Sequence, residues 1–548
     1  MIFQAVELPE RWTGSSLYYR SFPEIAPFFP AGDPRREETY FHRQAYLKRH
    51  FPLEVRAKVA SVLRHYNRSL GAGEASLANA GKLANPGTLA VVTGQQAGLL
   101  TGPLLTVYKA LTAVALAGQL EALLQVDVVP VFWIASEDHD LQEINHVHIL
   151  GEKNRHKTVY FSYALNGQPP VQWIETGPAC RQFLADCLRL VRSGPYFADM
   201  AALLQETLSG TRNICDWFGA ILLRLFAKEG LVCLNPMLPE LRQLQEPVFR
   251  RGLEEAGTIN GLLADNAKAL AAHGFTAAVQ KKAEHTHLFL LQEGNRLPVY
   301  LDGGGFQVGD RRFAREELAA CLAERPEQFS PDVILRPVSQ EVLLPVLAYV
   351  AGPGEVDYWA QLGDIFRVFS LEMPPIYPRA GLTLVEPGAA HVMEKHRLAP
   401  EEILDDLAGA LNSRLDQRDT AGLPRLFANG RAELENTYRE LVEQLPGTLK
   451  AELQAAWQES MSRTIRNWTW LQSQAAKAHR RQNRDLIDDF RCLETELLPM
   501  GRRQENVYNF FSYYSLYGPG LIQALLPGIL TDAVHQFLFL GGVTSGAS

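Results

Sequence analysis

From about residue 88 the chain alternates short apolar runs with longer amphipathic segments. The runs TLAVVT (88–93) and VDVVPVFWIA (126–135) flank an apolar segment that follows Pro103. Near-continuous apolar runs of this length are typical of parallel strands covered on both faces. Proline suits the first turn of a helix, because its missing N–H would be unpaired there. The pattern therefore predicts a strand–helix–strand unit.

Further apolar segments continue this alternation. Residues 216–230 place Trp217, Leu222 and Phe226 at helical spacing, Gly230 can cap the end of that helix, and LVCLN follows as a strand. The segments DVIL (332–335) and PVLAYVA (345–351) also have the composition of buried strands. We therefore expect an α/β domain with a parallel sheet over roughly residues 60–380, interrupted by less regular sequence at about 150–330.

After Arg379 the apolar spacing becomes that of a coiled-coil seam. Steps of three and four residues relate three groups: Leu404, Leu407 and Leu411; Leu434, Tyr438, Leu441 and Leu445; and Leu486, Phe490, Leu493 and Leu497. No proline or glycine lies between Leu449 and Leu498. One helix there would be about 75 Å long at ~1.5 Å per residue, so it must pair with a helix of its own chain or of a partner. The expected domains are a core at 1–380, and a helical dimerisation domain with a C-terminal segment at 381–548.

Composition narrows the class of protein. Of 548 residues, 47% are hydrophobic and 21% are charged, which excludes wholesale disorder. The formal charge of -8 argues against a nucleic-acid-binding protein that depends on broad phosphate contacts, although His479, Arg480, Arg481 and Arg484 could form a local basic patch. The six cysteines form no C-x-x-C pair, and neither a signal peptide nor a membrane span is evident. These features predict a cytoplasmic protein with reduced thiols and no membrane association.

The loop after the first predicted strand is the first candidate site. Gly94, Gln95, Gln96 and Gly98 lie between that strand and the helix. Glycines let the backbone approach a ligand, and the N–H groups at the start of a helix favour an anion. The loop is neither a Walker loop nor a G-x-G-x-x-G motif, so a nucleotide or anion site and a structural turn are equally supported.

The second candidate is the acidic segment after the second predicted strand. Glu137, Asp138, His139 and Asp140 are costly to bury unless they are paired, solvated or used. His139 could be a general base or polarise a phosphate, and Asp138 or Asp140 could bind an amine or orient the imidazole. The alternative is a solvated loop that caps a helix. His146 and His148 could suggest a metal site together with His139. No metal site is expected, however, because the spacing of His146 and His148 suits one face of a strand and no third ligand is evident.

The third candidate follows PVLAYVA. Its residues are Gly354, Glu355, Tyr358, Trp359 and Gln361, which could bind a substrate amine and form a pocket wall, or could start an ordinary helix. Arg336, Arg379 and Lys109 are further candidates for binding carboxylates, with a structural salt bridge as the commoner role for such arginines. Because ligands of open parallel sheets bind at the carboxyl ends of strands, the three candidates are expected to meet.

Four motifs taken together resemble the cysteine-adding enzymes of bacillithiol synthesis. They are VVTGQQAGLLTGPLLTVYKA, PVFWIASEDHDLQEINHV, ILRPVSQEVLLPVLAYVAGPGEVDYWAQL and MPPIYPRAG. The resemblance covers nearly the whole chain, including the late segment RRQENVYNFFSYYSLYG. It implies a Rossmann-like core akin to nucleotidyltransferases and class I aminoacyl-tRNA synthetases, connecting insertions and a coiled coil that forms a homodimer.

The resemblance also implies the reaction, which joins the carboxyl group of L-cysteine to the amine of glucosaminyl-malate. ATP could activate the carboxylate, although the H-x-G-H motif and lysine-rich loop of class I synthetases are absent, so ATP rests on analogy of fold. Two other functions stay open at this point. One is a tRNA-linked synthetase or nucleotidyltransferase relative, and the other is a non-catalytic coiled-coil scaffold.

Overall fold

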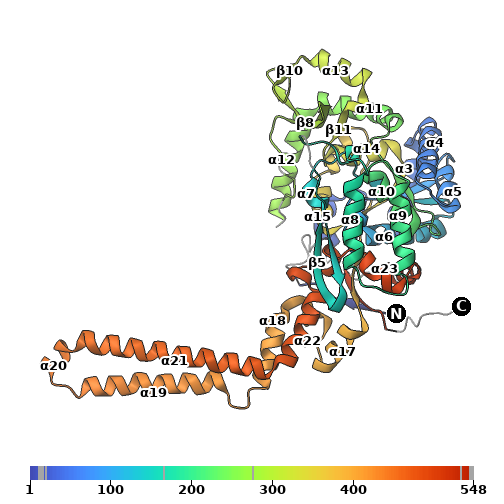
Figure 1. Cartoon of the computed structure of the whole chain (residues 1–548). Coiled ribbons are helices and arrows are strands. Elements are labelled where there is room, and N and C mark those ends of the chain that lie inside the picture. Colours follow the sequence, from blue (N-terminus) through green and yellow to red (C-terminus); the bar gives the residue numbers. More distant parts are fainter. Residues whose placement is uncertain are drawn as a thin grey trace. The chain divides into compact units, whose positions relative to one another are not determined.

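The computed structural model describes residues 1–9, 18, 21–163, 167–273, 277–279, 281–530 and 534–541 (Figure 1). The chain divides into two compact units, of which the first comprises Met1–Glu386 and the chain from Arg502 onward, and the second comprises Pro387–Gly501. The sequence analysis assigned residues 381–548 to one helical domain with a C-terminal segment. The chain returns to the first unit because its last strand, β15 (His535–Phe539), lies between β1 (Ile2–Val6) and β14 (Gly381–Val385).

The core of the first unit is a five-stranded parallel sheet with the order β13-β12-β2-β3-β6. Its strands are β2 (Leu89–Gln95), β3 (Val128–Ile134), β6 (Val232–Leu234), β12 (Val346–Ala351) and β13 (Ile376–Pro378). From β2 the chain proceeds to β3 and β6 on one side, and then returns to β12 on the other. The switch in strand order therefore lies between β2 and β12, which is where ligands of such sheets bind.

The apolar runs form strands here because both faces of the sheet are covered. Successive residues of β2 alternate between two hydrophobic clusters, with Val91 in one and Val92 in the other. Helix α6 (Leu104–Leu124) packs on β2 and β3. Among the described residues it is the one helix long and apolar enough to cross a membrane, and most of it is buried in the first unit, as in the core helix of a globular domain. The predicted strand–helix–strand unit is thus confirmed.

Further elements of the first unit surround this sheet. Before β2 lie α2 (Phe22–Ile25), α3 (Glu37–His50), α4 (Leu53–Ser69) and α5 (Glu74–Lys82). Around β12 and β13 lie α14 (Leu335–Leu343), α15 (Pro353–Trp359) and α16 (Gly363–Val368), and the returning segment adds α23 (Phe511–Tyr517) and α24 (Gly520–Leu525).

The less regular sequence at 150–330 consists of two insertions separated by β6. The first contains α7 (Leu141–Ile144), β4 (His146–Gly151), β5 (Arg155–Tyr160), α8 (Pro178–Leu190), α9 (Phe197–Ser209) and α10 (Ile214–Leu225). The second contains α11 (Pro239–Glu254), α12 (Ala256–Ala272), β7 (His285–Gln292), β8 (Asn295–Asp302), β9 (Gly305–Val308), β10 (Arg311–Phe313), α13 (Arg315–Glu324) and β11 (Phe329–Pro331). Strands β7 to β11 form an antiparallel sheet of their own.

The strand predicted at 332–335 is wrong. Strand β11 ends at Pro331, and Asp332 instead starts the turn into α14. The Asp332 Oδ1 atom accepts hydrogen bonds from the backbone N–H groups of Ile334 and Leu335 at 2.8 and 3.3 Å. Asp side chains favour this capping role, which ends the extended conformation that the apolar residues alone would suggest.

The second unit is helical, as the coiled-coil spacing of apolar residues predicted. Its helices are α17 (Pro387–His396), α18 (Pro400–Gln417), α19 (Leu423–Glu443), α20 (Gly447–Glu452), α21 (Gln454–Gln482) and α22 (Arg484–Leu497). Helices α19 and α21 form an antiparallel pair within one chain, in which Trp468 Nε1 donates to the Phe427 carbonyl at 2.9 Å. The single helix considered between Leu449 and Leu498 is wrong, because the chain breaks at Leu453 and Asn483. Beyond Asn483, α22 packs on α17 and α18.

The register of the predicted seam is partly correct. Leu486, Phe490, Leu493 and Leu497 are all buried. In α19, however, Leu441 is 62% exposed and the neighbouring Val442 is buried. The seam therefore passes from Tyr438 to Val442, a step of four residues that the sequence allowed equally well.

Candidate functional site

A cleft of about 850 Å³ opens at the carboxyl ends of β2, β3 and β12. Most residues singled out in the sequence line it: Gly94, Gln95, Gln96, Lys109, Glu137, Asp138, His139, Arg336, Gly354, Glu355, Tyr358 and Arg379. Gly98, Asp140, Trp359 and Gln361 are not among its lining residues. The three predicted segments thus meet at the switch point of the sheet.

The loop after β2 is tied to the other segments of the cleft through its glutamines. Gln95 Oε1 accepts from Lys109 Nζ at 2.8 Å, and Gln96 Nε2 donates to Asp138 Oδ2 at 2.6 Å and to Glu143. The first amide of α6, at Leu104, donates to the Tyr508 carbonyl. That backbone N–H is therefore already hydrogen-bonded within the protein. The loop presents the side-chain amides of its glutamines to a ligand, and not the N–H at the start of a helix.

Glycine at position 94 is required by the close approach of β3. A Cβ atom there would lie 2.9 Å from the Trp133 carbonyl oxygen and 3.1 Å from the Trp133 Cβ. We expect Gly94→Ala to lower the free energy of unfolding by about 1–3 kcal/mol, because the backbone of a central strand must shift. Denaturant unfolding measures this. Gly354→Ala is the matched control, since nothing lies within 4 Å of its new methyl group, and an equal loss there would contradict the steric account.

The carboxylates after β3 have three different environments. Glu137 is buried and forms an ion pair with the fully buried Arg242. Asp138 accepts from Gln96 and from the His139 backbone N–H at 2.7 Å. Burial alone would raise the pKa of Asp138, but the hydrogen bond from Gln96 and the charge of Arg296 hold it below its usual value. Asp138 is thus an ionised group facing the cleft and suited to binding a cation.

Asp140 caps α7, because its Oδ1 accepts from the Gln142 backbone N–H at 3.0 Å. The sequence left helix capping open as an alternative role for residues 137–140. Of these four residues, Asp140 has that role. Asp140 therefore positions the segment from outside the cleft lining.

His139 is held as a neutral imidazole. Its Nδ1 lies 3.2 Å from Arg296 Nη1, and arginine can only donate, so Nδ1 accepts and the proton of the neutral ring is on Nε2. Burial, and then the charge of Arg296, lower the pKa of His139. The Asp138 carboxylate lies 3.8 Å from Nδ1, too far for a hydrogen bond. This geometry favours His139 as a hydrogen-bond donor to an anion over His139 as a general base.

Lys109 joins the β2 loop to the start of α15. Its ammonium donates to the Gly94 carbonyl at 2.7 Å and to Gln95 Oε1, and it forms an ion pair with Glu355. Burial lowers the pKa of Lys109, while the charge of Glu355 opposes this effect. An ammonium has three donors, and three protein groups take them. Lys109 therefore positions the cleft rather than reaching a ligand directly.

Arg336 faces the cleft from α14 with neutral partners. Its Nη2 donates to the Tyr358 hydroxyl at 2.9 Å, and its guanidinium lies over the Tyr349 ring at 5.2 Å from the centroid. Tyr349 in turn donates to Glu355 Oε1 at 3.0 Å. Within the described part of the chain, no carboxylate forms an ion pair with Arg336.

Arg296 is a second cation in the lining of the cleft, and its side chain is buried. It donates to Ser330 Oγ at 2.9 Å, to the Pro331 carbonyl at 2.7 Å and to His139, and it stacks on Phe289. No described carboxylate forms an ion pair with it. Carboxylates act on both guanidinium groups from a distance, among them Asp138 on Arg296 and Glu355 on Arg336. Because no described carboxylate is in ion-pair contact with either group, both are suited to an anionic ligand.

Arg379 has the structural role that the sequence left open. It forms a bidentate pair with the buried Glu505, with contacts of 2.9 and 3.1 Å, and donates to the Ala380 carbonyl. Burial alone would raise the pKa of Glu505, but the charges of Arg379 and Arg503 hold it well below its usual range. This pair fastens the returning C-terminal segment to the wall of the cleft.

Two predicted residues of the third segment are structural. Trp359 is fully buried and packs on Tyr349 and Phe366. Gln361 is buried and exchanges hydrogen bonds with the backbone of Val279. Gly98 likewise serves a turn, since a Cβ atom there would lie 2.9 Å from the Gly102 Cα.

Several lining residues were missed in the sequence: Lys281, Phe289, Arg296, Asp332, Tyr349 and Arg503. Three of them, Lys281, Phe289 and Arg296, come from the second insertion, and nothing local connects Arg296 with His139, 157 residues away. Tyr349 could have been predicted as a lining residue, because it is the polar residue within the apolar run of β12.

The fold and the site together define a Rossmann-like α/β protein with a cleft lined by two arginines at the topological switch point. The chain belongs to the bacillithiol biosynthesis BshC family. The description of the family's N-terminal Rossmann-like domain matches residues 1–380, and that of its C-terminal coiled-coil domain matches residues 382–539.

Full-length relatives agree with this assignment. The chain is 34% identical over 515 residues to a protein of Desulforamulus reducens, covering 93% of this chain and 94% of the relative. It is 34% identical over 541 residues to a protein of Symbiobacterium thermophilum, covering 95% and 97%. Both relatives carry the name "Putative cysteine ligase BshC". These matches favour neither the tRNA-linked enzyme nor the scaffold. A solved structure from Campylobacter jejuni described as an arginyl-tRNA synthetase aligns with 11% identity, 82% coverage of this chain, 99% of that chain and a TM-score of 0.20, which is too low to compare folds.

Proposed function

We propose that this chain forms the amide bond between the carboxyl group of L-cysteine and the amine of glucosaminyl-malate, giving bacillithiol, in the cleft at the ends of β2, β3 and β12. One observation carries the proposal: two guanidinium groups, those of the buried Arg296 and the partly buried Arg336, line this cleft with neutral protein partners. Cysteine has one carboxylate and malate has two. Membership of the bacillithiol biosynthesis family supports these substrates.

The Arg336 side of the cleft suits the malyl carboxylates. Guanidinium groups match carboxylate geometry with two parallel hydrogen bonds. Tyr358 and Tyr349 hold Arg336 from the protein side, and Lys109 with Glu355 fixes the neighbouring wall. In this arrangement Arg336 binds a malyl carboxylate directly, whereas Lys109 and Arg379 position the segments around it.

The Arg296 side suits the activated cysteine carboxylate. If ATP is the activator, a cysteine carboxylate oxygen attacks phosphorus, giving an acyl adenylate and pyrophosphate or an acyl phosphate and ADP. The amine then displaces AMP or phosphate and loses one proton. His139 Nε2 and Arg296 would donate to the anionic groups, and the ionised Asp138 would attract the amine. Gln95 and Gln96 also line the cleft.

An isotope experiment tests both the ligation and its activation. Purified protein is given cysteine labelled with ¹⁸O in its carboxylate, glucosaminyl-malate and ATP, and all products are analysed by mass spectrometry. Label in AMP identifies an adenylate, and label in phosphate identifies an acyl phosphate. Amide product without label transfer would refute ATP activation while keeping the ligase. Absence of amide product from folded protein would refute the ligase itself.

The pH dependence of the reaction tests the state of His139. Because burial and Arg296 lower its pKa, we expect kcat/KM to stay flat as the pH falls through about 6.5, the ordinary value for histidine. Arg296→Met removes the charge and the donor. The His139 pKa should then rise, because the charge of Arg296 no longer lowers it, and NMR titration of the imidazole measures this rise. A wild-type profile that already falls there, and is flattened by His139→Asn, would contradict the assignment.

We also propose that the α19–α21 arm pairs with a second copy of the chain, giving a homodimer. Large apolar side chains remain exposed on the arm after α19 and α21 have paired: Leu426, Leu441, Leu449, Leu453, Trp470 and Leu471. Sedimentation equilibrium should give twice the chain mass for the wild type. The double variant Leu441→Glu, Trp470→Glu should give one chain mass with unchanged helicity, whereas a variant that still sediments as a dimer would exclude this surface.

We place the reaction in the cytoplasm. All six cysteines are free, and four of them are buried. Free thiols are typical of reducing compartments, and ATP is also available there.

A further inference from the structure

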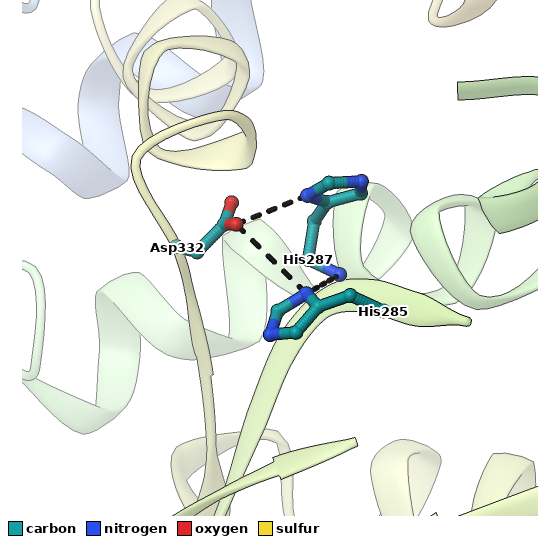
Figure 2. A group of neighbouring side chains, drawn as sticks. All are labelled: His285, His287 and Asp332. Carbon is teal, nitrogen blue, oxygen red and sulfur yellow. Dashed lines mark hydrogen bonds and ion pairs between the residues drawn. The ribbon is translucent and has the colours of Figure 1, made fainter. Parts of the chain in front are cut away.

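A second cluster of ionisable side chains lies behind the cleft. His285 and His287 are on β7, and Asp332 follows β11, which pairs with β7 through Leu288 and Pro331. All three side chains are buried and point towards one another (Figure 2). His287 Nδ1 lies 3.0 Å and His285 Nδ1 lies 3.9 Å from the same atom, Asp332 Oδ2. His287 has a φ of +63°, a strained conformation for a residue other than glycine.

The hydrogen bonds of Asn260 determine the proton on His287. The Asn260 amide nitrogen donates to the carbonyls of Ala283 and His285, at 2.7 and 2.9 Å, so its Oδ1 atom must accept. Oδ1 lies 2.9 Å from His287 Nε2, which therefore carries a proton. In the neutral ring, the lone pair of Nδ1 then faces the Asp332 carboxylate at 3.0 Å. Two lone pairs at this distance repel unless a proton or a metal ion lies between them.

The surroundings favour a metal ion in that position. Ligating histidines commonly donate their other ring N–H to an oxygen acceptor, as His287 does to Asn260. Zinc–nitrogen and zinc–oxygen bonds of ~2.0–2.1 Å in a tetrahedron place ligand atoms about 3.3 Å apart. The distances of 3.0 and 3.9 Å to Asp332 Oδ2 bracket this value. Two imidazoles and one carboxylate form a donor set for Zn²⁺ and related divalent ions.

We propose that His287, Asp332 and His285 bind one divalent transition-metal ion, with its open coordination position towards the cleft. Asp332 and Lys281 line the cleft, whereas His285 and His287 are not among its lining residues. Two adjustments accompany binding. His285 Nδ1 gives up the hydrogen bond from the His287 backbone N–H, and the partly exposed Lys281, now 3.8 Å from Asp332 Oδ2, turns into the cleft. The sequence expected no metal, because it considered only His139, His146 and His148.

Metal titration of the full chain tests this site independently of its activity. Chelator-treated wild-type protein is titrated with Co²⁺, followed by visible absorption, and then with Zn²⁺ in competition. We expect one equivalent of Co²⁺ per chain, with the intense visible bands of low coordination number, displaced by Zn²⁺. His287→Gln and Asp332→Asn should abolish stoichiometric binding. Folded wild-type protein that binds no stoichiometric metal would overturn the proposal, since a proton would then bridge His287 and Asp332.

Two further variants separate ligation from general loss of structure. Asn260→Ala leaves all three ligand side chains in place but removes the acceptor of the His287 N–H, together with the two hydrogen bonds to the Ala283 and His285 carbonyls, and we expect it to weaken metal affinity about 10–100-fold. His148→Gln is the matched control, because His146 and His148 are also two residues apart on a strand, β4, and it should leave affinity unchanged. If the ligand variants do not fold, the metal stoichiometry of the wild type and the change in metal affinity of Asn260→Ala still test the proposed site. Unchanged affinity in Asn260→Ala, or an equal loss in His148→Gln, would refute the assigned ligands.

Discussion

Replacing Glu505 with alanine is expected to lower the free energy of unfolding by about 3–5 kcal/mol, because it leaves two buried guanidinium groups without their carboxylate. Arg379 and Glu505 are almost completely buried, and Arg503 lies 3.2 Å from the same carboxylate. The Leu382 backbone N–H also donates to Glu505 at 2.8 Å. The loss therefore involves the late C-terminal segment, β14 and the cleft wall at once. Denaturant unfolding of the full chain measures it.

The control for this prediction is an exposed ion pair. Arg311 and Glu317 are about half exposed, and Glu317→Ala should change stability by no more than about 1 kcal/mol. The pH dependence gives a second check. The pKa of Glu505 is lowered in the folded state, so its contribution is present above its unfolded value of about 4.3 and is lost as the pH falls towards the folded value. Glu505→Gln should flatten that acid loss, and an unchanged acid profile would contradict the assignment.

Replacing Lys109 with methionine is expected to reduce kcat/KM about 10²-fold while the protein stays folded. Methionine fills most of the same space, but the Gly94 carbonyl, Gln95 and Glu355 lose their common donor. The β2 loop and the start of α15 are then no longer held together, and small displacements of this kind can cost about 10²-fold in rate. Because Lys109 acts through these groups, the loss should fall mainly on kcat rather than on KM. Steady-state kinetics measures kcat and KM, and a thermal melt of each protein shows whether it is folded.

Lys82→Met is the matched control for Lys109→Met. Lys82 pairs with Asp127 at 2.8 Å, with both side chains more than a third exposed, and its loss should leave kcat/KM unchanged. A Lys109→Met protein with wild-type kinetics would show that the cleft is not the reaction site. A loss confined to KM would instead indicate that Lys109 contacts the substrate directly.

The sequence predicted the core of the fold because local patterns determine it. Near-continuous apolar strands and the proline before α6 identified β2, α6, β3, β6 and β12, whereas the helix expected to be capped by Gly230 ends earlier, as α10 at Leu225. The rule that ligands bind at the carboxyl ends of parallel strands then brought Gly94, His139 and Glu355 to one cleft. These residues are each close in sequence to a recognisable strand.

The remaining features depend on contacts between distant segments, which no local pattern shows. Arg296 reaches His139 from the second insertion, and Glu505 reaches Arg379 from 126 residues away. Asp332 was assigned to a strand because its apolar neighbours outweighed its capping tendency. The seam of α19 was misplaced by one residue at Leu441, because an apolar residue stands at both positions and only packing against α21 selects between them.

The most direct test of the central claim is the mass spectrum of the thiols formed by purified full-length protein from L-cysteine, glucosaminyl-malate and ATP. The account predicts a product with the combined mass of the two substrates less one water, formed by the wild type and reduced about 10²-fold by Lys109→Met. Folded wild-type protein that leaves both substrates unchanged, under conditions in which they are stable, would contradict it.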